Sequence, residues 1–160
     1  MSKDRPSPIR PTDEEARGLA RQLLTEARFG ALAVTLSDQA APYVSRVACV
    51  HIDGAPHILV STLSLHTKAL TAHPDCSLLV GEPEDRGDPL THPRMTLITR
   101  AEPADKAAHR SSWLDAIPKA KLYIDFTDFL MFRLTILEAH LNGGFGKAFH
   151  LKAEDLHAQT

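Results

Sequence analysis

Five polar residues in the first half of the chain have the types and spacing that favour anion binding: Arg46, Ser61, Thr62, Thr67 and Lys68. Arg46 lies in a strand-like apolar run, and the other four gather where a second such run meets a short helix. The first turn of a helix presents unpaired N–H groups and a positive dipole end to an anion. Because hydroxyl groups and a lysine at that point suit a phosphate monoester, this pattern predicts a phosphate site.

Each of these features also has a purely structural explanation. Side chains in a strand alternate between two faces, so Arg46 lies on the more apolar face of the run 43–52. Burying an unpaired guanidinium costs several kcal/mol, and for Arg46 alone we favour a salt bridge to one of the protein's own carboxylates over a ligand. A serine N-cap and a solvent-facing Lys68 would equally explain the helix start.

Short β-forming runs separated by turn residues must position this segment. Asp53 and Gly54 supply the positive-φ pair of a tight hairpin, and an acidic loop is expected at 82–93. We predict strands at 31–36, 43–52, 57–61, 76–81, 94–101 and 131–141, and a short terminal strand at 147–151.

Three helical segments interrupt the strands. Thr12 and Glu15 have the spacing of a capping box, and an apolar stripe follows at helical period as far as Gly30. The segment 65–72 suits a two-turn helix, and 103–116 a third helix that Pro118 interrupts. The stripe of the first helix would dock onto the barrel or onto a partner subunit.

This order of elements predicts a mainly β protein with helical decorations. Six or seven antiparallel strands at hairpin spacing favour a small closed barrel, whose interior side chains fill. A ligand would therefore lie in an outer groove or at a subunit interface. The 160 residues, 43% of them hydrophobic, suit one domain over 12–152, with an extended arm at 1–11 and a polar tail at 153–160.

Composition excludes several functional classes. Eighteen basic and 20 acidic residues give a net charge of −2, so we expect no nucleic-acid partner. The sequence has neither an apolar run of about 18 residues nor a signal peptide, and Cys49 and Cys76 fit buried free thiols in a reducing compartment. We therefore expect a cytoplasmic protein that does not associate with membranes.

Metal and hydrolase chemistry is not predicted either. The motifs HExxH, GxSxG, GxxxxGK[ST] and GxGxxG after a strand are all missing. His150 and His157 are interpreted as ordinary surface histidines, because no second ligand accompanies them at a metal-binding spacing. We therefore predict no metal site.

Around these five polar residues the chain resembles the FMN-binding split β-barrel family related to pyridoxamine 5′-phosphate oxidase. The resemblance covers about residues 12–152. Its closest likeness is to the heme iron utilisation branch, carried by His73-Pro74-x-Cys76, Gly87-Asp88-Pro89-Leu90, Arg94-Met-Thr-Leu, Tyr123-x-Asp125-Phe126-x-Asp128-Phe129, Phe132-Arg133-Leu134 and Leu141-Asn-Gly-Gly-Phe-Gly146.

The resemblance implies a homodimer with two equivalent FMN sites at the subunit interface. Arg46, Thr67 and Lys68 would then hold the phosphate. Ser61 and Thr62 would lie beside the isoalloxazine ring. The joint spacing of these residues favours ligand binding over the structural explanations of each one alone.

Four further residues enter the site by the same resemblance. Arg94 and Met95 would approach from the neighbouring subunit, and Phe145 could stack on the ring, although its glycine-rich turn is at least as well explained by positive φ angles. His66, like His51, lies near the predicted phosphate site and could contact the cofactor. A structural hydrogen bond is, however, the usual role of a single histidine.

Two functions remain open at this point. The first is an FMN-dependent oxidoreductase that passes electrons between a reduced donor and a small acceptor. The second is a non-catalytic FMN or heme binder. Activity of a true pyridoxamine 5′-phosphate oxidase is not expected, because its arginine- and tryptophan-bearing segment is not seen after Gly146. The additional domain of longer heme utilisation relatives is not seen either, which disfavours heme degradation.

Overall fold

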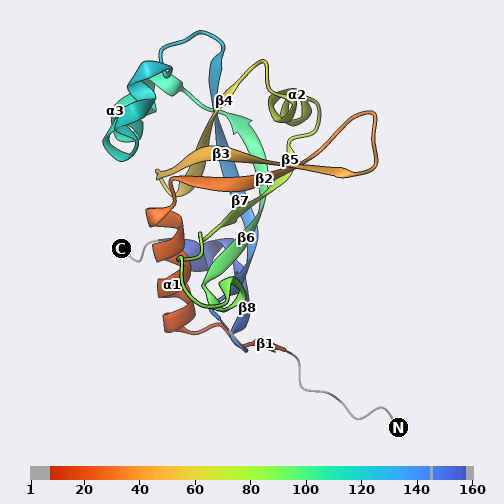
Figure 1. The fold of residues 1–160 in the computed structure, drawn as a ribbon, viewed down its shortest axis with the longest axis vertical. Coiled ribbons are helices and arrows are strands. Elements are labelled where there is room, and N and C mark those ends of the chain that lie inside the picture. Colours follow the sequence, from red (N-terminus) through yellow and green to blue (C-terminus); the bar gives the residue numbers. More distant parts are fainter. Residues whose placement is uncertain (1–7, 145, 158–160) are drawn as a thin grey trace.

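The strands of the computed structural model, which describes residues 8–144 and 146–157, join in one sheet. The spatial order is β1-β8-β7-β4-β3-β2-β5-β6, and β6 also pairs with β7 (Figure 1). This extra pairing closes β2 to β7 into an antiparallel barrel. The strands are β1 (Ile9–Arg10), β2 (Phe29–Thr35), β3 (Pro42–Ile52), β4 (Ala55–Ser61), β5 (Asp75–Val80), β6 (Arg94–Pro103), β7 (Phe129–Asn142) and β8 (Ala148–Lys152).

The barrel confirms the predicted fold class. Alternating residues of β2 and β6, such as Leu32, Val34 and Leu97, are buried and point inward, as the period of a strand requires. The turn at Asp53 and Gly54 has φ angles of 48° and 81°, so the hairpin between β3 and β4 also forms as predicted.

The helices lie outside the barrel. In Figure 1, α1 runs along one side, while α2 and α3 lie at the upper end. Trp113 of α3 is completely buried in a second, smaller core cluster beneath that helix. The bounds are α1 (Glu14–Glu26), α2 (Leu65–Ala72) and α3 (Lys106–Ala116), with 3₁₀ turns η1 (Pro89–Thr91), η2 (Pro118–Leu122) and η3 (Ala153–Leu156).

The first helix begins one residue later than the predicted capping box. Asp13 is the N-cap, and its carboxylate accepts a hydrogen bond from the N–H of Ala16 at 2.8 Å. Thr12 instead donates its hydroxyl to the carbonyl of His150 at 3.0 Å. Asp and Thr are both good N-caps, so the sequence could not choose between neighbouring candidates.

Both ends of the described chain are more ordered than the sequence predicts. Ile9 and Arg10, placed in an extended arm, pair in parallel with β8. Leu156, placed in a polar tail, is 4% exposed and belongs to the main core. A two-residue strand and a single buried leucine have no periodicity, which explains why the sequence does not reveal them.

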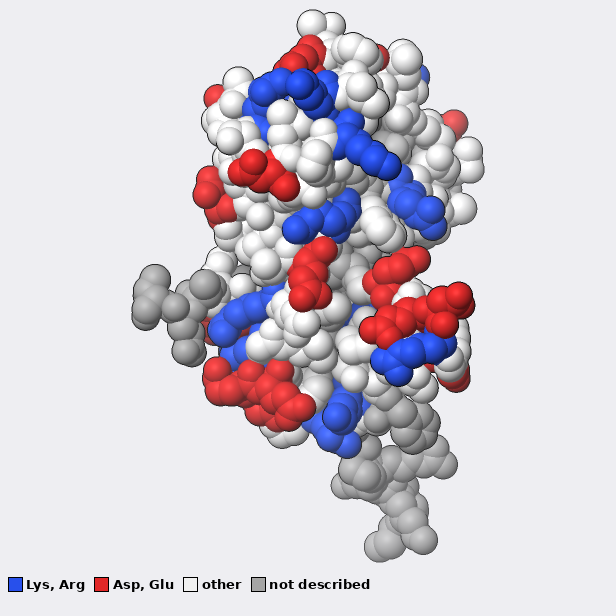
Figure 2. Space-filling model, turned by 60° about the vertical axis from the view of Figure 1, so that its left-hand side comes forward, with Lys and Arg blue, Asp and Glu red and all other residues white. Residues whose placement is uncertain are grey.

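Charged side chains of both signs are distributed over the face shown in Figure 2. Lys and Arg side chains are most frequent toward the upper end of that view, where α3 and η2 lie. Along the described residues, the helices are all too short or too polar to cross a membrane.

Two leucines of β7 test the assignment of the barrel core. Leu134 is 0% exposed and Leu137 is 54% exposed. We expect Leu134→Ala to lower the free energy of unfolding by about 2–5 kcal/mol, because the substitution leaves a cavity. The same change at Leu137 should stay within about 0.5 kcal/mol. Urea unfolding measures both, and equal losses would contradict this core.

Candidate functional site

The turn between β4 and α2 is held by its own hydrogen bonds. The carbonyl of Ser61 accepts from the N–H of Ser64 at 3.1 Å and from the hydroxyl of Thr67 at 2.5 Å. The N–H of Thr62 donates to the carbonyl of Asp128 at 2.7 Å, which ties this turn to the segment before β7. Thr67 is 3% exposed. Its hydroxyl therefore stabilises the turn and is not free to bind a ligand.

The start of α2 keeps donors for an anion. Among the described residues, the N–H groups of Leu65 and His66 have no acceptor, and Ser64 makes no side-chain cap bond. Lys68 is exposed and, within the same part of the chain, forms no ion pair. Free N–H groups, the helix dipole and a lysine together attract an anion.

His66 has a structural contact of its own. Its Nδ1 lies 3.0 Å from the hydroxyl of Ser45 on β3. Partial burial lowers the pKa of His66 below its usual value, because the charged form loses solvation. At neutral pH His66 is therefore a neutral side chain that anchors α2 to the barrel.

Arg46 lies on the other side of β3 from α2. Consecutive strand residues face opposite ways, so Ser45 faces His66 while Arg46 points away from it. The Arg46 guanidinium lies 5.6 Å from the centroid of the Phe29 ring and borders a small cavity of about 110 Å³ that also contacts Gly81.

The guanidinium of Arg46 reaches solvent and therefore needs no buried anionic partner. Arg46 is exposed, because the N-terminal half of β3 is uncovered on that face and Val44 is 60% exposed. The expected salt bridge to a carboxylate is also missing among the described residues. Stacking on Phe29 takes its place.

Arg94 and Met95 do not join the turn before α2. Arg94 donates to the carbonyl of Leu90 at 2.9 Å and borders the strand end at Gly81. Met95 is 0% exposed inside the barrel, so its predicted contact with a cofactor from a neighbouring subunit does not fit this fold. Phe145 lies outside the described residues.

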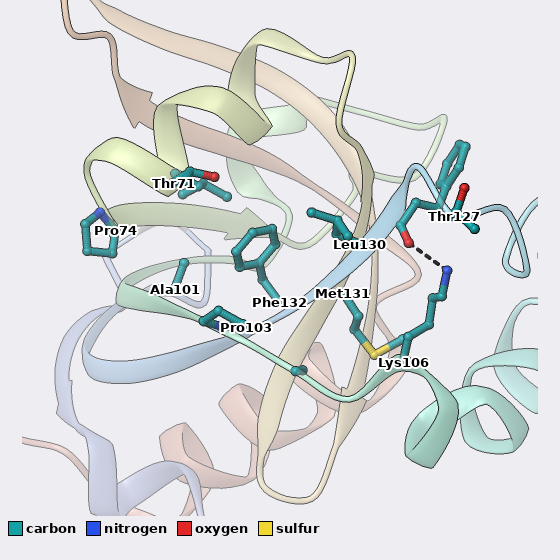
Figure 3. A pocket seen from close by; sticks show the side chains of 12 residues that line it. Thr71, Pro74, Ala101, Pro103, Lys106, Thr127, Leu130, Met131 and Phe132 are labelled. Atoms are coloured by element: carbon teal, nitrogen blue, oxygen red, sulfur yellow. Dashed lines mark hydrogen bonds between the residues drawn. The ribbon is translucent and has the colours of Figure 1, made fainter.

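A large apolar pocket, here called the α2–β7 pocket, opens beside this turn. Its volume is about 730 Å³, within the range of small-molecule sites. Figure 3 shows Phe132 and Leu130 facing Thr71 and Pro74 across it, with Lys106 on the far wall. The lining residues are Leu70, Thr71, Pro74, Ala101, Pro103, Ala104, Lys106, Thr127, Phe129, Leu130, Met131 and Phe132.

Lys106 supplies the positive charge of this pocket. Its ammonium group donates to the carbonyls of Phe126 and Phe129 at 2.8 and 2.7 Å, and Figure 3 shows its position on the pocket wall. Both partners are neutral carbonyls, and the carboxylate of Asp125 attracts the ammonium group only at longer range, without an ion pair among the described residues. One of the three N–H groups of the ammonium is left for a ligand. Lys68 precedes the lining residue Thr71 by three positions, which places both on neighbouring parts of the helix surface.

Exposed apolar side chains lie close to the pocket. Leu63 and Leu65, which flank the turn before α2, are 79% and 47% exposed. Phe126, three residues before β7, and Leu130, near its start, are 55% and 39% exposed. The bond between Thr62 and Asp128 brings the two segments together. The mouth of the pocket is thus apolar as well as its walls.

Sequence reasoning therefore found one edge of this site and missed its walls. Ser61 and Thr62 lie next to the pocket, because Ser61 pairs with Phe129. The walls come from α2, the end of β6, the start of α3 and the start of β7. These segments are far apart in the sequence, and no local motif connects them. Chemically, the arrangement suits a planar apolar ring system that carries an anionic group.

Comparison with known proteins agrees with this fold. Residues 11–158 match the family model described as CREG, β-barrel. The non-canonical heme oxygenase HOZ, a chloroplastic protein of Arabidopsis thaliana, is 42% identical over 101 residues, which cover 61% of this chain and 30% of the plant protein.

Two solved structures are similar over most of the chain. A heme-binding protein from Mycobacterium smegmatis is 31% identical with a TM-score of 0.81, covering 92% of this chain and 61% of that one. A Clostridium acetobutylicum protein of the pyridoxinephosphate oxidase family, related to general stress protein 26, is 15% identical with a TM-score of 0.69, covering 91% and 100%.

These similarities confirm the resemblance inferred from the sequence. The two relatives named for heme are only partly spanned by this chain, over 30% and 61% of their lengths. The family match, in contrast, extends over almost all of the described residues. The chain therefore belongs to the CREG β-barrel family, and its fold is the split barrel of pyridoxinephosphate-oxidase-like proteins.

Proposed function

We propose that this protein binds heme in the α2–β7 pocket. The observation that carries the proposal is an apolar cavity of about 730 Å³ whose wall holds the ammonium group of Lys106, hydrogen-bonded only to carbonyls among the described residues. A porphyrin has large apolar faces and two propionate groups, so it needs both features. Identities of 42% and 31% to proteins named for heme oxygenation and heme binding add support.

The residues present fit this ligand. Phe129, Leu130 and Phe132 offer apolar surface for the ring, and Lys106 offers an ammonium for a propionate. Histidine and cysteine are not among the lining residues, and the buried side chain of Met131 packs in the second core cluster. When bound, heme supplies oxygen or electron-transfer chemistry. The chain's own residues would orient the ring and exclude water.

FMN is the second candidate, favoured by the free N–H groups of Leu65 and His66 at the start of α2. They and Lys68 would hold its phosphate, and the isoalloxazine ring would enter the neighbouring pocket. The protein would then be a flavin oxidoreductase that passes electrons from a reduced donor to a small acceptor. Flavin and heme share the chemistry of a planar ring with an anionic tail.

We also propose that a second copy of the chain covers the mouth of the pocket. The exposed side chains of Leu63, Leu65, Phe126 and Leu130 would be buried in a symmetric dimer, which removes apolar surface from water. A cofactor at the boundary between two copies would be shielded from solvent on its open side.

Hemin titration of the full chain tests the first proposal. We expect a Soret band that saturates at one hemin per chain. Lys106→Met keeps most of the apolar stem but removes the charge, so it should weaken binding about 10- to 100-fold, corresponding to about 1.5–3 kcal/mol for a charged hydrogen bond. Lys119→Met, at an exposed position of η2, is the matched control. Unchanged affinity in a folded Lys106→Met protein would refute this site.

Titration with FMN, followed by quenching of flavin fluorescence, tests the second candidate. Lys68→Ala should weaken FMN binding by about 1.5–3 kcal/mol if this lysine contacts the phosphate directly, whereas Lys121→Ala in η2 should not. Anaerobic addition of NADH or NADPH then reports whether bound flavin accepts electrons. Protein that saturates with hemin but not with FMN would eliminate the flavin candidate.

A matched pair of leucines tests the dimer. Leu63 and Leu122 are exposed to nearly the same extent, 79% and 78%, but only Leu63 lies beside the pocket. Light scattering should show a dimer for the native chain and for Leu122→Glu, and a shift toward monomer for Leu63→Glu, because a buried charge opposes association. A monomeric native protein at micromolar concentration would disprove the interface.

A further inference from the structure

Three potential metal ligands come together where β7 pairs with β8. Glu138 and His140 are two positions apart on β7 and so lie on the same face. His150 on β8 is the direct cross-strand partner of His140. One ligand atom from each of the three side chains lies within 4.8 Å of the others.

The two histidines direct the same nitrogen toward the carboxylate. His150 Nε2 lies 2.9 Å from Glu138 Oε2, and His140 Nε2 lies 3.6 Å from Glu138 Oε1. The imidazole rings are stacked, with centroids 4.8 Å apart and planes inclined by 8°. Three donor atoms therefore surround one small volume on the outside of the barrel.

We propose that Glu138, His140 and His150 bind a divalent transition-metal ion, with Zn²⁺ as the best-suited probe. Two imidazoles and one carboxylate are typical of zinc and iron sites, whereas Ca²⁺ and Mg²⁺ prefer oxygen ligands. Ligand atoms in a tetrahedral zinc site lie about 2.0–2.2 Å from the ion, and so about 3.3–3.6 Å from one another. Three protein ligands leave a fourth position for water or an exogenous ligand.

The surroundings allow the three ligand atoms to move closer to a common ion. The side chains of Glu138, His140 and His150 are 43%, 51% and 46% exposed, so side-chain rotations that shift the ligand atoms by about 1 Å meet little resistance. The backbone beneath them is fixed by the β7–β8 ladder and by the bond from Thr12 to the carbonyl of His150. Lys152 is the cross-strand partner of Glu138, and its flexible stem allows the ammonium to turn away from a bound cation.

The metal site is independent of the proposed cofactor pocket. Phe132, which lines the pocket, precedes Glu138 by six residues, which corresponds to about 20 Å along a strand. Figure 1 shows β8 toward the lower end of the barrel and α2 at the upper end. Loss of zinc binding should therefore leave hemin or FMN binding unchanged, and the two proposals can fail separately.

Isothermal titration of the chelator-treated full chain with ZnCl₂ tests the site. We expect one Zn²⁺ per chain. Substitutions His140→Ala and His150→Ala should each weaken the affinity for Zn²⁺ at least about 100-fold. Loss of a residue that only supports a metal ligand weakens affinity by about 10- to 100-fold, and loss of a ligand itself should cost at least as much. His157→Ala, a substitution at another exposed histidine, should leave the affinity unchanged.

Cobalt substitution provides a second measurement that depends on the ligands themselves. Co²⁺ bound by two imidazoles and a carboxylate gives visible ligand-field bands, and Glu138→Gln should change these bands while circular dichroism remains native. Native protein that does not bind Zn²⁺ would overturn the proposal. Equal affinities of the native, His140→Ala and His150→Ala proteins would also overturn it, because the ion would then bind elsewhere.

Discussion

The pairing of β7 with three different strands organises this molecule. β7 pairs with β4 over residues 129–133, with β6 over 132–142 and with β8 over 138–142. The β6 pairing closes the barrel, and an irregularity after Ile98 lets β6 follow β7 over this length. One edge of β7 leaves the barrel halfway along, because β8 replaces β4 as its partner. The two halves of the strand therefore have different surroundings.

This division of β7 separates two kinds of chemistry. Its first half carries Phe129 and Phe132, which face the α2–β7 pocket together with residues of α2 and Lys106. Its second half carries Glu138 and His140 on the outer face beside His150. Apolar burial governs the first site and ligand donor chemistry the second. The two sites share no residue among those that the structure describes.

The fold by itself does not decide which cofactor the protein uses. Solved split barrels similar to this chain include a protein named for heme and one placed in the pyridoxinephosphate oxidase family. In this chain, the hydroxyl of Thr67 bonds within the turn, and the exposed Arg46 stacks on the ring of Phe29 on the other side of β3. The phosphate-binding residues implied by the resemblance therefore do not form one cluster within a single copy of the chain.

The sequence by itself determined the class of fold and most of its elements. Strand periodicity, the Asp53-Gly54 turn and the apolar stripe of the first helix are local properties, and local properties are encoded in neighbouring residues. The sequence also identified Ser61 to Lys68 as a polar helix start. The resemblance to the FMN-binding split barrels extended this to the family.

Only the tertiary structure decided which side chains meet. It placed Arg46 on the side of β3 away from α2, buried Met95, and added Lys106 and Phe132 to the site. It also brought His140 and His150 together as cross-strand partners, although His150 has no metal-binding motif around it. The physical reason is that sheet register and helix docking depend on how the whole core packs, which no short spacing in the sequence records.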